Sequence, residues 1–295
     1  MRYGVYVQNF GEYADPHDLI ALACDAEQAG WDGFFLWDHL HLWHSDIPFV
    51  DAWVALAGIA ARTERIRLGP LIAPLARRRP WKVAREVLSL DHLSRGRTVL
   101  GVGLGAPADG EFECFGEDPT DRVRAHKLDE TLVILDGLWR GETFSHDGEF
   151  FHIDRAKFVP RALQSPRVPV WVAGFWPNKP PMRRAARWDG MFPLKMPPVA
   201  LTDLRPGTVP WSAFWLQPHE LEQAVKYVRQ YRTDSAPFDV IASGATPLGE
   251  RTQGKAIVGA LGAAGATWWL EWLDEQRGSL AQMREHIRKG PPDIG

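Results

Sequence analysis

The sequence predicts an α/β fold, a (β/α)₈ barrel of the TIM type, and three observations support this prediction. Short apolar runs alternate with amphipathic helical patterns along the chain, as βα units require. The run at residues 34–37 is apolar on both faces, which is typical of a parallel strand covered by helices. Eight such runs occur, and no glycine-rich dinucleotide fingerprint follows the first, so a barrel is favoured over an open doubly wound sheet.

The predicted elements follow one another closely, as in consecutive βα units. The strand candidates are residues 3–8, 33–37, 66–72, 98–103, 170–174, 190–194, 238–242 and 267–271. Capping residues and periodicity predict helices at residues 16–29, 51–63, 81–93 and 122–139. Residues 195–218, rich in Pro and Trp, predict an extended loop after the sixth strand. We therefore expect one domain that covers residues 1–295.

Composition and charge indicate a small-molecule partner. The 295 residues are 45% hydrophobic with a net charge of -3, so no overall positive charge attracts nucleic acid or an anionic membrane. The two cysteines, Cys24 and Cys114, match neither a disulfide framework nor a metal-site spacing. Residues 2–8 predict a strand and not a signal peptide, and no apolar run is long enough to span a membrane. These features predict a soluble, cytoplasmic protein.

Asp38 and His39 are the most informative polar residues, because they directly follow the second predicted strand. Active sites of parallel barrels lie at the carboxyl ends of the strands. A histidine there can hydrogen-bond a ligand or transfer a proton near neutral pH. We therefore predict that both residues are functional, whereas a lone Asp-His pair elsewhere in a chain is more often structural.

Five segments between residues 26 and 190 stand in an order and spacing that carry a resemblance over nearly the whole chain. They are AEQAGWD (26–32) leading to WDH (37–39), TERIRLG (63–69), DHLSRGR (91–97), LGVGLG (100–105), and VWVAG (170–174) followed by RWDG (187–190). No segment is specific by itself, but together they resemble the luciferase-like monooxygenase family of flavin- and deazaflavin-dependent barrel oxidoreductases. The resemblance implies that FMN or a 5-deazaflavin, coenzyme F420, is the cofactor.

The resemblance also implies where the cofactor ring lies. The family places a non-prolyl cis peptide against the ring at the end of the third strand, and the matching bond here joins Leu71 and Ile72. Asp38 and His39 match the family's pair at the polar edge of the ring. The run Gly103-Leu104-Gly105 after the fourth strand would let the backbone approach the cofactor closely.

The family often places the phosphate site after the fifth strand, where N–H groups at a helix start can bind an anion. This sequence departs from the usual small residues there, because Phe175 follows Gly174. The candidates for phosphate contact are Asn178 and Lys179, and a solvated Pro-rich turn is the alternative.

The cofactor decides the reaction that the resemblance implies, because reduced FMN activates oxygen for insertion whereas a deazaflavin is restricted to hydride transfer. The spacing from His39 to Trp43 resembles the deazaflavin-dependent dehydrogenases. However, Ala106 stands where the sugar-phosphate dehydrogenases of the family carry a glutamate, which argues against a sugar phosphate. Trp37, Trp43 and Trp176 suggest a small, apolar substrate, although tryptophans also pack in cores.

Two other functions are compatible with the residues. His39 and His41, with His44 nearby, resemble the metal-binding pair of a metal-dependent barrel hydrolase, although the later strand ends offer few further ligands. The second alternative is a flavin-binding protein that does not catalyse a reaction. The resemblance further implies a homodimer. It also implies a separate reductase as partner, which is a flavin reductase for an FMN enzyme and a deazaflavin reductase for a deazaflavin enzyme.

Overall fold

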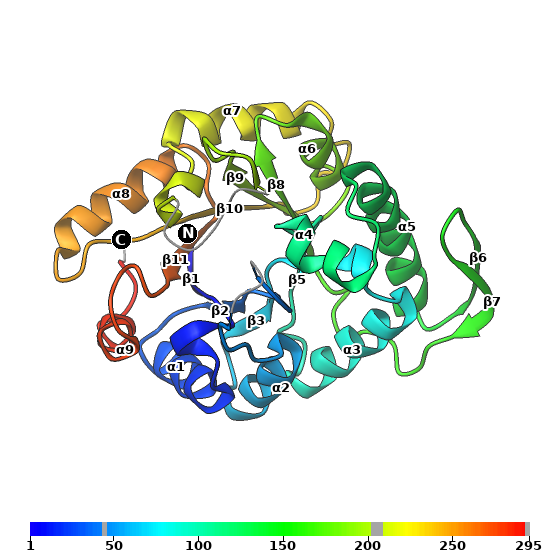
Figure 1. Cartoon of the computed structure of the whole chain (residues 1–295), viewed down its shortest axis with the longest axis horizontal. Coiled ribbons are helices and arrows are strands. Elements are labelled where there is room, and N and C mark those ends of the chain that lie inside the picture. Colours follow the sequence, from blue (N-terminus) through cyan, green and yellow to red (C-terminus); the bar gives the residue numbers. More distant parts are fainter. Residues whose placement is uncertain (43–45, 202–208, 293–295) are drawn as a thin grey trace.

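The computed structural model describes residues 1–42, 46–201 and 209–292. Figure 1 shows strands at the centre of the molecule, enclosed by a ring of helices. The central strands, each parallel to its neighbours, are β1 Arg2–Val7, β2 Gly33–Leu36, β3 Arg67–Pro70, β4 Ala73–Pro74, β5 Leu100–Gly103, β8 Val170–Trp176, β9 Gly190–Lys195, β10 Asp239–Gly244 and β11 Trp268–Leu273.

The order of strands in this sheet is β3-β2-β1-β11-β10-β9-β8-β5-β4. β3 pairs with β2 while β4 pairs with β5, and only Leu71 and Ile72 separate β3 from β4. β3 and β4 are therefore two halves of one barrel strand, and Leu68 adds a parallel bridge to Thr98 just before β5. The strands thus close in chain order into the predicted (β/α)₈ barrel, and every predicted strand is present.

The helices form the outer ring in Figure 1. Those that follow the barrel strands are α1 Pro16–Gln28, α2 Ala52–Arg62, α3 Pro80–Leu93, α5 Asp121–Trp139, α6 Lys179–Ala185, α7 Pro218–Arg229, α8 Arg251–Ala263 and α9 Leu280–Arg288. The four predicted helices, α1, α2, α3 and α5, end within one residue of their predicted bounds. Asp15 and Asp51 begin α1 and α2, because each side chain accepts a hydrogen bond from a backbone N–H of the first turn. No helix in the described part of the chain is both long and apolar enough to span a membrane.

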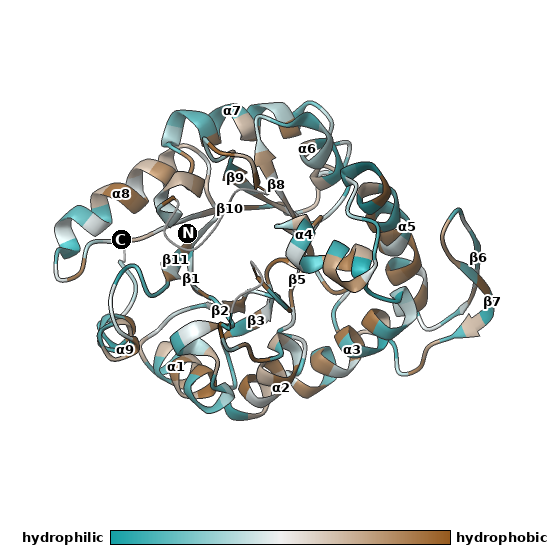
Figure 2. Cartoon of the chain, in the orientation of Figure 1, coloured by the Kyte–Doolittle hydropathy of each residue, from teal (hydrophilic) through white to brown (hydrophobic). Residues whose placement is uncertain are grey.

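Two apolar layers hold the barrel together. Along β2, Phe34 and Leu36 pack between the sheet and the helices, whereas Phe35 points into the barrel with Trp171 and Trp268. Burying one such side chain stabilises the fold by about 1.5–3 kcal/mol. Figure 2 shows the corresponding pattern, in which hydrophilic colour is most frequent on the outer helices and loops.

A hairpin outside the barrel was not predicted. Its strands β6 Thr143–Asp147 and β7 His152–Lys157 are antiparallel, and Figure 1 shows them projecting beyond α3 and α5. Both strands are polar and largely exposed, so they lack the apolar run by which the barrel strands were predicted. Glu130 of α5 holds the turn, because its carboxylate accepts hydrogen bonds from the N–H groups of Phe150 and Phe151.

The extended loop predicted after the sixth barrel strand is present between β9 and α7. Residues 202–208 of this loop lie outside the described part. A short 3₁₀ turn, Trp211–Phe214, belongs to it and buries Phe214. The loop therefore returns over the carboxyl end of the barrel and contributes apolar side chains there.

Candidate active site

A cavity of about 530 Å³ lies at the carboxyl ends of the barrel strands. The segments that follow β2, β5, β8 and β9 form most of its wall, and Tyr6 and Trp272 complete it from β1 and β11. Active sites of parallel barrels lie at this end. The predicted site residues that line the cavity are Trp37, Asp38, His39, Ile72, Gly103, Leu104, Gly105, Gly174, Phe175 and Asn178.

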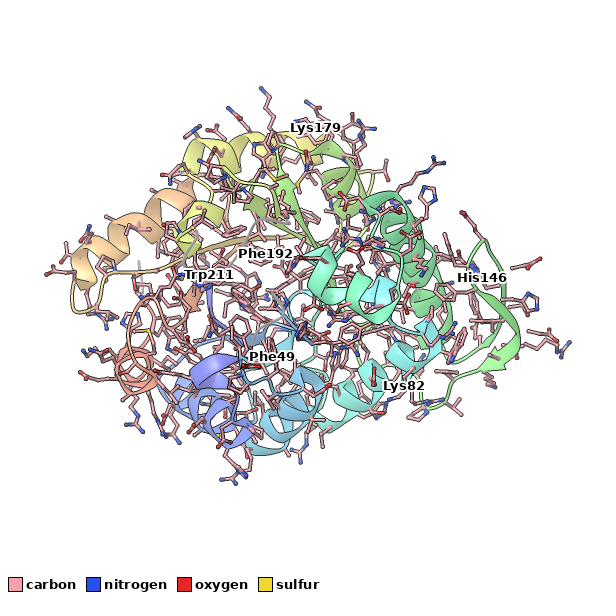
Figure 3. The ribbon with its side chains drawn as sticks, in the orientation of Figure 1. Phe49, Lys82, His146, Lys179, Phe192 and Trp211 are labelled. Atoms are coloured by element: carbon pink, nitrogen blue, oxygen red, sulfur yellow. The ribbon has the colours of Figure 1, made fainter. Side chains whose placement is uncertain are left out.

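Lys179 and Trp176, predicted to contact phosphate and substrate, are not among the residues that line this cavity. The Nζ atom of Lys179 lies 3.8 Å from the centre of the Trp176 ring and 4.4 Å from that of Tyr227 in α7. Figure 3 shows Lys179 at the outer edge of the molecule. Trp176, the last residue of β8, is buried among the side chains between the sheet and the helices, and Lys179 begins α6, which contacts α7. Trp43, the other tryptophan predicted to bind substrate, lies outside the described residues.

Leu71 and Ile72 have different surroundings. The peptide bond between them is cis, which confirms the expectation drawn from the family resemblance. Leu71 is buried in the barrel interior and is not among the lining residues, whereas Ile72 lines the cavity. A Cβ atom added to Gly103 would lie 2.7 Å from Cγ2 of Ile72, so only glycine permits this close contact. Ile72 and Gly103 therefore form a closely packed apolar part of the wall.

Asp38 is held by cationic and polar neighbours on every side. The Nη2 atom of Arg78 donates to both carboxylate oxygens, at 2.8 and 2.9 Å, and the indole of Trp53 donates to Oδ2 at 3.1 Å. Arg77 adds a second guanidinium, 3.4 Å from Oδ1, and also donates to the Asp38 carbonyl. Neither arginine was predicted to be a site residue. In the structure they hold the Asp38 carboxylate in place.

His39 faces the cavity on one side and a buried glutamate on the other. Its Nδ1 lies 2.8 Å from Oε1 of Glu111, and its side chain is 18% exposed while that of Glu111 is 0% exposed. Burial, followed by the charge of Arg77, lowers the pKa of His39 to about 3, against the opposing effect of Asp38. The ring is therefore neutral near pH 7, and its contact with Glu111 is a hydrogen bond and not an ion pair.

Glu111 is a site residue that sequence reasoning missed. It is the last residue of the short helix α4 Ala108–Glu111 in the loop after β5, and its carboxylate contacts the guanidinium of Arg77. Burial lowers the pKa of Arg77 to about 10, so this arginine is still charged at neutral pH. Glu111 and His39 are 72 positions apart in the chain, and only the convergence of the β2 and β5 loops brings them together.

Arginines gather at another part of the cavity wall, at the start of α5 and on α6. Arg124 is 4% exposed, and its Nη1 donates to the carbonyl oxygens of Leu104 and Gly105 at 3.0 and 2.6 Å. Arg184, 7% exposed, pairs with Asp129 at 2.7 and 2.8 Å. Arg122 is exposed and has no carboxylate partner among the described residues. The first turn of α5 adds N–H groups that no side chain of its N-cap residue satisfies.

The remaining wall is aromatic. The ring centre of Trp37 lies 5.1 Å from that of Trp211 and 5.2 Å from that of Trp272, and all three rings line the cavity. Figure 3 shows Trp211 well inside the outline of the molecule. The indole Nε1 atoms of Trp37 and Trp272 are buried and donate to no described group. This part of the cavity therefore suits an apolar ligand.

The metal-hydrolase alternative gains no support from the described residues. Among them, no three His, Cys, Asp or Glu side chains are grouped so that they could hold a metal ion. His44, one of the predicted ligands, lies outside the described residues. His39 is engaged by Glu111 at Nδ1.

The sequence match decides the family. A family model described as luciferase-like monooxygenase matches residues 1–203. The chain belongs to the luciferase-like monooxygenase family. An F420-dependent glucose-6-phosphate dehydrogenase from Gordonia bronchialis is 32% identical over 171 residues, which are 56% of this chain and 49% of that protein. The chain thus spans about half the length of the relatives that it matches.

Solved structures confirm the barrel fold of this luciferase-like protein. The coenzyme F420-dependent tetrahydromethanopterin reductase from Methanopyrus kandleri has a TM-score of 0.73 at 14% identity, covering 98% of both chains. The oxygenating component of 3,6-diketocamphane monooxygenase from Pseudomonas putida, in complex with FMN, has a TM-score of 0.63 at 17% identity, covering 88% of this chain and 70% of the other. At such low identities the likeness concerns the fold.

Proposed function

We propose that the protein is a flavin- or deazaflavin-dependent oxidoreductase that acts on a small, apolar molecule. One observation carries the proposal: a single cavity at the carboxyl end of the barrel combines an apolar wall, a neutral histidine and an arginine cluster. A flavin-type cofactor needs these three features for its ring, its reactive edge and its phosphate.

The residues of the cavity fit such a cofactor. Ile72 and Gly103 would back the ring, and the unpaired Arg122 with the first turn of α5 would hold the anionic tail. Asn178, near the same wall, is a further polar contact. When bound in its reduced form, FMN supplies oxygen activation and a deazaflavin supplies a hydride.

His39 is the residue that would move a proton. Its Nδ1 is taken by Glu111, so Nε2 is the ring nitrogen available to a ligand in the cavity. With Nδ1 engaged, Nε2 of the neutral ring would accept a hydrogen bond from the ligand group that gives up its proton, and so orient that group for the transfer. Asp38 is a positioning residue in this proposal, because both of its carboxylate oxygens are occupied by Arg78 and Trp53.

The aromatic wall supports an apolar substrate. Trp37, Trp211 and Trp272 surround one part of the cavity, and no lysine among the described residues lines that part to receive a sugar phosphate. Ala106, which stands where the sugar-phosphate dehydrogenases carry a glutamate, also lines the cavity without supplying a carboxylate.

The proposal extends to partners and location. A separate reductase would supply the reduced cofactor, and the family resemblance favours a homodimer, for which α2 and α3, with exposed Val54 and Leu93, are the candidate interface. Light scattering on a sizing column tests the dimer. The two free cysteines, Cys24 and Cys114, suit a reducing cytoplasm.

The test is a titration of the purified protein with FMN, coenzyme F420 and riboflavin, followed by cofactor fluorescence. Micromolar binding of FMN alone would make oxygen consumption the next assay, with a flavin reductase and apolar ketones as substrates. Selective binding of coenzyme F420 would instead lead to assays of hydride transfer. Binding with no turnover in either assay favours the non-catalytic alternative, and binding of no cofactor contradicts the proposal.

A further inference from the structure

We infer that Glu111 is a positioning residue that fixes His39 as the Nδ1–H tautomer and so presents Nε2 to the cavity as a hydrogen-bond acceptor. The inference rests on the proposed function of His39 and adds the residue that prepares it. Glu111 lies behind His39 and is not among the residues that line the cavity, so it acts through the histidine and not on a ligand.

The carboxylate holds the segment of His39 at two points. Oε1 of Glu111 accepts from the imidazole at 2.8 Å and from the N–H of Leu40 at 3.2 Å. Asn9 holds the backbone of His39 from the other side, because its Nδ2 donates to the His39 carbonyl at 2.9 Å and its Oδ1 accepts from the His39 N–H at 3.3 Å. With the backbone and one ring nitrogen fixed, the orientation of the second ring nitrogen is fixed as well.

The charge balance explains why the contact is a hydrogen bond to a neutral ring. Asp38 and Glu111 supply two negative charges, and Arg77 and Arg78 supply two positive charges to the same buried network. This sum is zero without His39, so protonating the ring would add an uncompensated charge to a buried site. An ionised carboxylate only accepts hydrogen bonds, so the proton of the neutral ring belongs on Nδ1.

The first experiment uses the unmodified protein. Its histidines are labelled with ¹⁵N, the ring signals of His39 are assigned by their loss in His39→Gln, and the tautomer is identified from the two ring nitrogen shifts. At pH 7 we expect Nδ1 to be protonated and Nε2 to be unprotonated. This tautomer should be in at least about tenfold excess, because that is the preference that a hydrogen bond to a charged group gives. Either the Nε2–H tautomer or an imidazolium in the unmodified protein would overturn the inference.

The second experiment compares Glu111→Gln with Glu113→Gln, the same change at an exposed position two residues on. An amide can donate as well as accept, so the Glu111→Gln protein should show a mixture of tautomers, while the control keeps the tenfold excess. If removing the carboxylate beside Arg77 prevents folding, Glu111→Asp keeps the charge but shortens the reach, and a mixture is expected there too. An unchanged tautomer in either folded Glu111 variant would overturn the inference.

Turnover separates this inference from the proposed function. If Glu111→Gln reduces kcat about tenfold or more with an unchanged cofactor Kd, both stand. If the tautomer shifts as expected but His39→Gln does not change turnover, the role of His39 in the proposed function fails while the positioning contact stands. If His39→Gln abolishes turnover but Glu111→Gln has full activity and an unchanged tautomer, only the positioning role fails.

Discussion

Two acidic and two basic side chains around His39 cancel one another in a region largely closed to solvent. Arg77 lies between the carboxylates of Asp38 and Glu111, and its side chain is 4% exposed. A single added charge in such a region is energetically unfavourable, because water cannot solvate it. The neutral state of His39 therefore follows from its neighbours and not from the ring alone.

Replacing His39 with alanine tests its role at the reacting end of the cavity. We expect kcat to fall more than tenfold, because positioned acid–base groups typically contribute about 10²–10⁴-fold. Cofactor affinity should change little, because the ring and phosphate contacts come from other residues. The measurement is steady-state kinetics with the cofactor that binds, together with a titration of that cofactor. A variant with the kcat of the unmodified protein would remove His39 from the mechanism.

The lowered pKa of His39 also predicts how stability depends on pH. An unfolded histidine has a pKa near 6.5, whereas burial lowers that of folded His39 to about 3. Between these values the unfolded state binds more protons, so the free energy of unfolding falls as the pH drops from about 6.5 towards 3. In His39→Gln this loss should be smaller. Urea unfolding of both proteins at pH 7 and pH 4.5 measures the difference, and equal losses would contradict the assignment.

The site was predictable from the sequence only in part. Asp38 and His39 could be placed because they follow an apolar strand directly, and Ile72 because a family motif marks it. Glu111 and Arg77 could not, since contacts between loops that are 39 and 72 positions apart leave no local pattern. Lys179 illustrates the opposite case, because it was predicted at the site but does not line the cavity. Its place after β8 indicated the cavity, but the packing of α6 against α7 directs its side chain outward.

At the scale of the elements, the first turn of α5 is a candidate anion site. Its N–H groups lack a side-chain cap, and Arg122 of this turn lines the cavity. Arg124 ties the same turn to the β5 loop through the carbonyl oxygens of Leu104 and Gly105. The positive end of the helix and the loop that would back the ring are thus held in one unit.

Arg122→Gln tests this arrangement with two ligands that differ only by a phosphate. FMN affinity should fall about two- to fivefold, as expected for an exposed ion pair, while riboflavin affinity is unchanged. Arg140→Gln, at the far end of the same helix and away from the cavity, is the matched control. Isothermal titration calorimetry at low salt measures both ligands. Equal losses for FMN and riboflavin would show that Arg122 contacts something other than the phosphate.

Glu130 of α5 contacts the turn of the hairpin β6–β7. Glu130 accepts from the N–H groups of Phe150 and Phe151 at 3.0 and 2.8 Å. In Glu130→Gln these bonds lose their charge, so amide hydrogen exchange of Phe151 should rise about fivefold with cofactor affinity unchanged. Glu149→Gln, which alters an exposed side chain in the same turn, is the control. Exchange that stays at the level of the control would mean that other contacts hold the hairpin.

For the whole molecule, the barrel was predictable because its strands share one signal. Each is a short apolar run covered on both faces, and eight of them in sequence leave few alternatives to a closed parallel sheet. The hairpin carries no such signal, because β6 and β7 are exposed and polar. That the chain forms one domain over all 295 residues stays a prediction.

The cavity joins loops from several parts of the barrel, so a bound cofactor should stabilise the entire fold. A ligand at one hundred times its Kd raises the free energy of unfolding by about 2.7 kcal/mol. For a chain of this size we expect a Tm increase of roughly 5–10 °C that grows with ligand concentration. Thermal unfolding of the protein with each cofactor at several concentrations measures this increase in Tm.

Alanine substitutions at two glycines, Gly103 and Gly259, test whether this stabilisation comes from the cavity. A Cβ atom at Gly103 would meet Ile72 at 2.7 Å inside the cavity wall, whereas one at Gly259 of α8 would meet nothing within 4 Å. Gly103→Ala should therefore reduce the ligand-induced rise in Tm, because Ile72 must move into the space of the ring, while Gly259→Ala should keep it in full. If Gly103→Ala bound the cofactor as well as Gly259→Ala does, the ring would have to lie against another part of the wall.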